Sequence, residues 1–187
     1  MSEEQRQLIS KYVPLAGGSG REYHVLGIDL GTTNSTATHI YWSGIADEEP
    51  EVRVLSVEQP TERGFFRSAL VPSVVFRHAD GTTWVGEGAR DLLRKVGTKG
   101  IIPERTIFSE TKNDIGTPLT YPGAPADLKS PTAAAGHILR FLREEATREL
   151  PSGSAFDRIV VTVPASFTLQ QREHTRAAAI AAGIDIT

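Results

Sequence analysis

The residues best suited to chemistry lie together, where an apolar run ends in a carboxylate, a glycine and several hydroxyl and amide side chains. The run spans residues 25–30 and includes Asp29, and its composition predicts a buried strand. A buried carboxylate is costly unless it is paired or close to a metal ion, so Asp29 requires a partner. Gly31 would let the backbone come close to a ligand. The potential hydrogen-bond donors that follow it are the amides and side chains of Thr32, Thr33 and Asn34.

After this turn the chain resumes strand character at residues 36–42, so we expect a β-hairpin with a donor-rich tip and a carboxylate at its base. Such a hairpin suits a polyphosphate whose Mg²⁺ ion is held by Asp29, directly or through water. The residue types leave open the alternative of a plain hairpin with an aspartate at the end of a strand.

The overall composition is that of an ordinary soluble protein and argues against several classes of function. The 187 residues are 39% hydrophobic and 23% charged, with a formal net charge of −3. A net negative charge does not provide the excess of basic residues typical of nucleic-acid-binding proteins, so we expect no nucleic-acid partner. The chain has no cysteine, which excludes disulfides and thiolate metal sites and is compatible with a reducing cytoplasm. No apolar run approaches the roughly 18 residues of a membrane span, so we expect a cytoplasmic protein without a membrane partner.

Hydrophobic periodicity and turn residues divide the first two thirds of the chain into a tail, a meander and an insertion. Residues 1–22 end in a glycine-rich linker and are expected to form a flexible tail. Short connections between three strands predict an antiparallel meander. Strand and helix patterns interrupted by turn residues over about 58–130 predict an inserted α+β subdomain. The meander strands are expected at about 23–30, 36–42 and 51–57. The expected elements of the insertion are strands at 71–77 and 82–85 with a hairpin turn at 79–81, a helix at 87–96 and a short segment at 104–112.

The last third predicts a helix, a strand and a second helix. Ser130 and Pro131 are typical of the N-cap and first position of a helix, which we expect to end before residue 151. The β-branched run at 158–163 predicts a strand buried on both faces. Residues 168–171 fit a capping box for a second helix that runs to about residue 182, and residues 184–186 are expected to begin another strand.

Two stretches resemble a known family. Residues 27–35, Gly-Ile-Asp-Leu-Gly-Thr-Thr-Asn-Ser, resemble the first phosphate motif of the actin-like ATPases, in the form found in the DnaK-type (heat-shock protein 70) chaperones. Sugar kinases carry a similar motif. Residues 159–183 resemble a further segment of the chaperones that sugar kinases and actin do not share in this form. The resemblance gives Pro164 and Arg172 a role in coupling nucleotide state to the substrate domain, although Ser166 stands where the family usually has tyrosine.

A third, looser match lies in the expected insertion. Residues 106–116 resemble the family's Phe-x-x-Lys-Arg-x-x-Gly stretch, whose lysine reaches the γ-phosphate. Lys112 takes this role if one extra residue is allowed before it, and Asn113 and Asp114 replace the usual Arg-Leu. Upstream, Val71-Pro-Ser resembles the family's Thr-Pro-Ser.

The resemblance implies an α/β fold: the first, ribonuclease-H-like lobe of an actin-like ATPase, over residues 23–187. Its order is a three-strand meander, an inserted α+β subdomain and then helix–strand–helix. The family's second phosphate loop and adenosine pocket follow this region and have no counterpart in the sequence. We therefore expect an N-terminal part, truncated before the second lobe, of a longer protein that we call the parent protein.

The implied function is that of an ATP-hydrolysing molecular chaperone. The Gly31–Asn34 turn would grip the phosphates of ATP or ADP, Asp29 would organise Mg²⁺ through water, and Lys112 would steady the transferred phosphoryl group. The implied partners are unfolded polypeptide clients, a J-domain co-chaperone and a nucleotide exchange factor. Two alternatives remain open: a small-molecule (sugar) kinase of the same fold, and a non-catalytic nucleotide-binding module.

Overall fold

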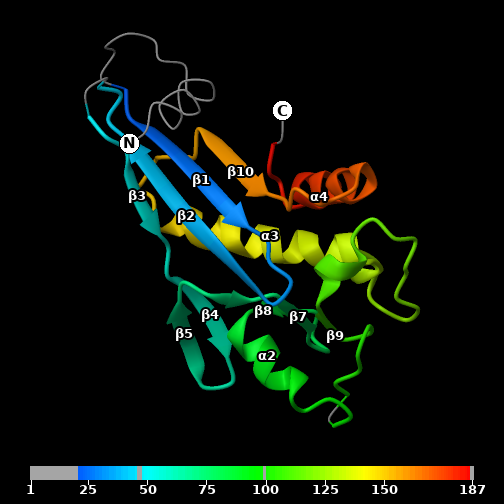
Figure 1. The fold of residues 1–187 in the computed structure, drawn as a ribbon. Coiled ribbons are helices and arrows are strands. Elements are labelled where there is room, and N and C mark those ends of the chain that lie inside the picture. The colour runs from blue at the N-terminus through cyan, green and yellow to red at the C-terminus, as the bar shows by residue number, and fades with distance from the viewer. Residues whose placement is uncertain (1–20, 46–47, 99, 186–187) are drawn as a thin grey trace.

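The computed structural model describes residues 21–45, 48–98 and 100–185 (Figure 1). The expected tail therefore lies outside the described residues, except for Arg21 and Glu22 at its end. Arg21 forms an ion pair with Asp157 at 2.5 Å, and the Tyr41 hydroxyl donates a hydrogen bond of 2.9 Å to Glu22. None of the helices within the described ranges combines the length and apolarity needed to cross a bilayer.

The main sheet contains the predicted meander. Its first three strands are antiparallel, and a fourth strand from the last part of the chain pairs in parallel with the first, giving the order β10-β1-β2-β3. A short strand, β6, pairs with the start of β2. The bounds are β1 (Tyr23–Asp29), β2 (Asn34–Trp42), β3 (Glu51–Val54), β6 (Val71–Pro72) and β10 (Arg158–Thr162).

Two helices accompany this sheet, and both begin as the sequence predicts. In α3 (Pro131–Arg148) the Ser130 side chain accepts a hydrogen bond from the amide of Ala133, and in α4 (Leu169–Ala181) Thr168 and Gln171 form a reciprocal capping box. The helix α3 runs behind β1 and β2, and α4 packs against it (Figure 1). The core between sheet and helices includes Leu26, Ile28, Ala37, Ile138, Leu139 and Leu142.

One expectation for this sheet is wrong, because β10 is not buried on both faces. Ile159 and Val161 pack against the core, whereas Val160 on the opposite face is 50% exposed. Within the described residues β10 is an edge strand of this sheet and only one of its faces is covered. The strand expected at 184–186 is also not seen at residues 184–185, and residue 186 lies outside the described range.

The region between β3 and α3 builds two smaller sheets and a short helix. Three strands form an antiparallel sheet with the order β8-β7-β9, and the predicted turn between β7 and β8 is closed by a 2.8 Å hydrogen bond from the His78 amide to the Thr82 carbonyl. A hairpin of β4 and β5 precedes them and was not predicted. The bounds are β4 (Val57–Thr61), β5 (Gly64–Ser68), β7 (Val74–Arg77), β8 (Thr83–Val85), α2 (Glu87–Leu93) and β9 (Ile107–Ser109).

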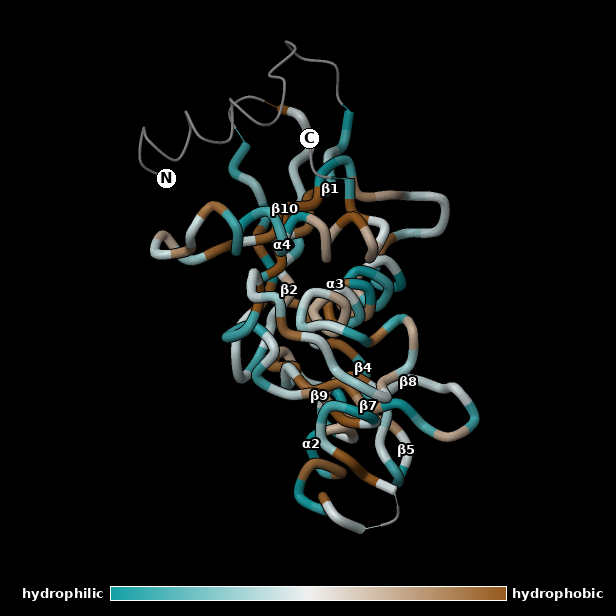
Figure 2. Tube along the Cα trace, turned by 90° about the vertical axis from the view of Figure 1, so that its right-hand side faces the viewer, coloured by the Kyte–Doolittle hydropathy of each residue, from teal (hydrophilic) through white to brown (hydrophobic). Residues whose placement is uncertain are grey.

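A second hydrophobic cluster lies within this region, and it is built from residues such as Phe76, Leu92 and Ile107. Figure 2 shows hydrophobic stretches of the chain along β1 and β10 and again near β7. Two short 3₁₀ helices, η1 (Thr111–Asp114) and η2 (Ala126–Leu128), link β9 to α3. The mixed α/β class is thus confirmed, whereas the boundaries of an inserted subdomain at about 58–130 stay a prediction.

Candidate functional site

The turn between β1 and β2 requires glycine at its first position. A Cβ atom on residue 31 would lie 1.9 Å from the carbonyl oxygen of Asn34, which is far inside van der Waals contact. The Gly31 amide also donates a 3.1 Å hydrogen bond to the Ser35 hydroxyl. The absence of a side chain therefore lets the chain fold tightly back on itself, and Thr33 is left exposed at the tip.

Two buried serines, Ser35 and Ser73, form hydrogen bonds with the turn. Ser35 is the last residue of the phosphate motif predicted from the sequence, whereas Ser73 was not identified as part of the site. Ser73 donates from its hydroxyl to the Gly31 carbonyl at 2.8 Å and from its amide to the Thr33 carbonyl at 2.9 Å. The hydroxyls of Ser35 and Ser73 lie 2.9 Å apart, and the two residues are 0% and 3% exposed. The available signal was the Val71-Pro-Ser match, in which the serine lies next to the strand that pairs with β2.

Asp29 is not buried, contrary to the expectation that opened the sequence analysis. It is the last residue of β1 and is exposed, and the Thr162 hydroxyl donates a 2.9 Å hydrogen bond to its carboxylate. The strand carries it to the end of the sheet, where the alternation of side chains turns it to the uncovered face. An exposed carboxylate at this place can meet a hydrated cation without the cost of burial.

The segment that carries Lys112 comes close to the same turn. After β9 the backbone of Glu110 takes a left-handed conformation, with φ of 55° and ψ of 19°, and η1 begins directly after it. Glu110 lies between Phe108 and Lys112, within the stretch where the expected match allows one extra residue. The Thr32 hydroxyl then lies 3.5 Å from the side-chain oxygen of Asn113, at the outer limit of a hydrogen bond.

A third segment, between β10 and α4, lies against the Lys112 segment. The ammonium group of Lys112 lies 5.5 Å from the centre of the Phe167 ring. Gly116, with φ of 88°, packs so closely against Gln171 that a Cβ atom would lie 3.0 Å from the Gln171 Cα. The fold thus brings together three motifs that are far apart in the sequence.

Pro164 and Arg172 are joined through the turn between them. The Phe167 amide donates to the Pro164 carbonyl at 3.1 Å. Arg172 is exposed, yet its guanidinium donates to the carbonyls of Phe167 and Ala165, each at 3.0 Å. Arg172 therefore stabilises the turn before α4 rather than extending into solvent alone.

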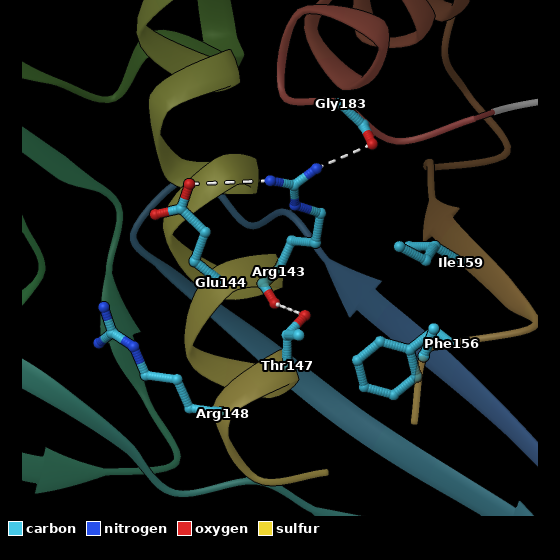
Figure 3. A pocket seen from close by; sticks show the side chains of 8 residues that line it. Arg143, Glu144, Thr147, Arg148, Phe156, Ile159 and Gly183 are labelled. Carbon is cyan, nitrogen blue, oxygen red and sulfur yellow. Dashed lines mark hydrogen bonds and ion pairs between the residues drawn. The ribbon is translucent and has the colours of Figure 1, made fainter. Parts of the chain in front are cut away.

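Other hollows lie away from this constellation. A pocket of about 460 Å³ lies between α3 and β10 and contains none of the predicted site residues (Figure 3). Its Arg143 donates to the Gly183 carbonyl at 2.9 Å and pairs with Glu144 at 3.7 Å. The described residues contain no group of three or more histidine, cysteine, aspartate or glutamate side chains that could hold a metal ion by themselves. A cation at Asp29 would need water or a ligand for its remaining coordination.

Comparison with known proteins identifies the family. The family model described as "Hsp70 protein" matches residues 99–187. A chaperone protein HscA homolog of Pseudomonas paraeruginosa is 33% identical over 86% of this chain and 26% of its own length. The chain belongs to the Hsp70 family. A chaperone protein DnaK of Metamycoplasma hominis is 32% identical over 87% of this chain and 23% of its own length.

The family assignment confirms the resemblance predicted from the sequence. The chain spans about a quarter of the length of the curated Hsp70 relatives it matches. Both of the relatives named here are described as chaperone proteins.

Proposed function

We propose that this chain is the phosphate-gripping lobe of an ATP-hydrolysing Hsp70 chaperone. The observation that carries the proposal is the convergence of three segments, through the Thr32–Asn113 contact, the Lys112–Phe167 contact and the packing of Gly116 on Gln171. Catalysis of phosphoryl transfer consists mostly of positioning and electrostatic stabilisation, which a site made of well-anchored loops can provide.

Each group has a distinct role in the proposed site. The amides and side chains of the Gly31–Asn34 turn bind the β- and γ-phosphates of ATP, and ADP after hydrolysis. Asp29 orients water molecules around Mg²⁺, and Lys112 stabilises negative charge on the γ-phosphoryl group. Bound Mg²⁺ would neutralise phosphate charge. The single exposed carboxylate beside the Thr162 hydroxyl suits such indirect binding better than direct coordination by a cluster.

The same proposal assigns the coupling role to the turn before α4. Pro164 and Arg172 would transmit the nucleotide state to a substrate domain of the parent protein, since Arg172 is bonded to the turn whose Phe167 meets Lys112. The proposed partners of the parent protein are unfolded polypeptides, a J-domain co-chaperone and a nucleotide exchange factor. Ser166 in place of the usual tyrosine removes an aromatic contact from this region.

The decisive experiment compares ATP turnover by the purified parent protein with and without an unfolded peptide, and assays sugar phosphorylation in parallel. We expect peptide-stimulated turnover and no phosphorylated sugar. Sugar phosphorylation would establish the kinase alternative instead. Nucleotide binding without turnover would establish the non-catalytic module. Asn113 and Asp114, which replace the family's usual Arg-Leu after the lysine, are the feature that favours this alternative.

A further inference from the structure

The aromatic ring of Phe167 lies beside a cation, the ammonium group of Lys112. The Lys112 ammonium lies 5.5 Å from the ring centre, within the roughly 6 Å range of a cation–π interaction. Both side chains are only partly exposed, and among the described residues Lys112 is found in no ion pair. Within the described residues, the Phe167 ring is therefore the charge-stabilising contact of the Lys112 ammonium.

Phe167 is held by its own backbone, independently of Lys112. Its carbonyl accepts a 3.0 Å hydrogen bond from Arg172 Nε, and its amide donates at 3.1 Å to the Pro164 carbonyl. A second bond from Arg172, to the Ala165 carbonyl at 3.0 Å, fixes the same turn. The position of the ring is thus set by the entry into α4.

The backbone of Lys112 is held equally well. Its neighbour Thr111 is 3% exposed and Ile115 is fully buried, so η1 is anchored on both sides of the lysine. The Asn113 amide donates to the Glu110 carbonyl at 3.0 Å, and Gly116 packs on Gln171 in the first turn of α4. The two main-chain segments that carry the ring and the ammonium group are therefore both held in place.

We propose that Phe167 is a positioning residue for Lys112, and that its ring holds the ammonium group beside the Gly31–Asn34 turn before nucleotide arrives. A lysine side chain has four rotatable bonds, and a ring that restricts them lowers the entropy lost when the ammonium meets a phosphate. The phosphate part of this statement rests on the proposed function. The restriction of Lys112 by the ring does not.

The restriction can be measured on the present chain by nuclear magnetic resonance. Protons over the face of an aromatic ring are shifted upfield, so the Lys112 ε-methylene signal, assigned by its loss in Lys112→Met, should lie upfield of the other lysines. Phe167→Leu should return it to the range of the other lysines, whereas Phe167→Tyr should preserve the shift. Phe156→Leu is the matched control, because Phe156 packs near His39, with ring centres 5.7 Å apart, and should leave Lys112 unchanged.

A Lys112 signal that is not shifted, or that does not respond to Phe167→Leu in a variant with an otherwise dispersed spectrum, would overturn the proposal. If Phe167→Leu does not fold, loss of the shift in Phe167→Tyr would overturn it, and a preserved shift would support it.

The functional part is tested in the parent protein by single-turnover ATP hydrolysis. We expect Phe167→Leu to lower the rate roughly tenfold with little change in ATP affinity, and Phe167→Tyr to restore it, because a cation–π contact needs an aromatic face. Equal losses in both variants would show that the ring is only structural, and would contradict positioning. A shifted Lys112 signal with an unchanged rate in Lys112→Ala would instead retain the contact and reject the phosphate role of Lys112 in the proposed function.

Discussion

The hydroxyl of Thr162 donates a 2.9 Å hydrogen bond to the carboxylate of Asp29, across the parallel pair of β1 and β10. The two residues are register partners at the last position of each strand, so the sheet itself places the donor beside the carboxylate. The bond fixes one carboxylate oxygen and leaves the residue exposed at the end of the sheet. This arrangement orients a negative charge toward solvent next to the Gly31 turn.

Asp29→Asn should leave the fold intact and weaken the dependence on Mg²⁺. The amide oxygen of asparagine can still accept from Thr162, so we expect the unfolding free energy of the chain to change by less than about 1 kcal/mol. In the parent protein the loss of the negative charge should raise the Mg²⁺ concentration needed for half-maximal ATP turnover. Normal turnover by the variant at limiting Mg²⁺ would show that Asp29 has only a structural role.

Gly31→Ala should destabilise the chain far more than Gly27→Ala. The new Cβ at residue 31 would lie 1.9 Å from the Asn34 carbonyl oxygen, whereas at residue 27 its nearest neighbour would be the Thr38 carbonyl oxygen at 3.8 Å. We expect a loss of at least about 2 kcal/mol for the first and a change within about 1 kcal/mol for the second. Urea denaturation of both variants measures the difference, and equal losses would mean that the turn is not as tight as described.

A pair of histidines should make stability depend on pH. His24 Nδ1 lies 2.9 Å from His39 Nε2, so at least one ring must be neutral for a hydrogen bond. Burial, together with the charges of His24 and Arg53, lowers the pKa of His39 below 6.5, against an opposing effect of Glu51. Because the pKa of His39 is lower in the folded chain, the unfolded chain binds a proton more readily. The contribution of His39 to stability is therefore fully present above the unfolded pKa of 6.5 and is lost as the pH falls through the lower folded pKa.

Replacing His39 by glutamine should therefore reduce the loss of stability on acidification. We expect the unfolding free energy of His39→Gln to fall less than that of the unchanged chain between about pH 8 and about pH 5. Chemical denaturation at the two pH values gives the comparison. A steeper fall in the variant would reverse the assigned direction of the pKa shift.

Local sequence signals predicted most of the regular elements. The Ser130 cap with Pro131 and the capping box at Thr168 predicted the starts of α3 and α4. They could do so because the side chains that cap the start of a helix lie within a few residues of its first turn. The meander of β1, β2 and β3 was predicted from the short connections between them, because strands joined by short connections pair in antiparallel with their neighbours in sequence. The hairpin of β4 and β5 was missed because Pro60 and the Glu62–Gly64 turn resemble a loop.

The environment of each element was predicted less well than its existence. A β-branched run has the same composition whether one face or both faces of its strand are covered, so the exposure of Val160 depends on tertiary context. Asp29 was expected to be buried because it lies in an apolar run, which does not show which face of the strand is covered. The contacts of Lys112 with Phe167, and of Ser73 with the Gly31 turn, join residues far apart in the chain, and no local pattern encodes such a distance.

The chain by itself should bind nucleotide weakly or not at all. The proposed site contacts only the phosphates, and contacts from one turn must offset the loss of ligand freedom, which costs at least several kcal/mol. Titration calorimetry of the chain with Mg-ATP should show no binding in the micromolar range. Micromolar or tighter binding would mean that adenosine has a pocket within these residues and that the proposed division of the site is wrong.

Single-turnover ATP hydrolysis by Lys112→Ala in the parent protein tests the proposed γ-phosphate role of Lys112 most directly. If Lys112 meets the γ-phosphate, its charge matters more in the transition state than in the bound ground state, and loss of such a donor typically costs roughly 3 kcal/mol, about a hundredfold in rate. We expect that reduction in rate, with a much smaller change in ATP affinity. A rate within about threefold of the unchanged protein would contradict the account, because Lys112 would then be a surface lysine resting on Phe167 without a part in the chemistry.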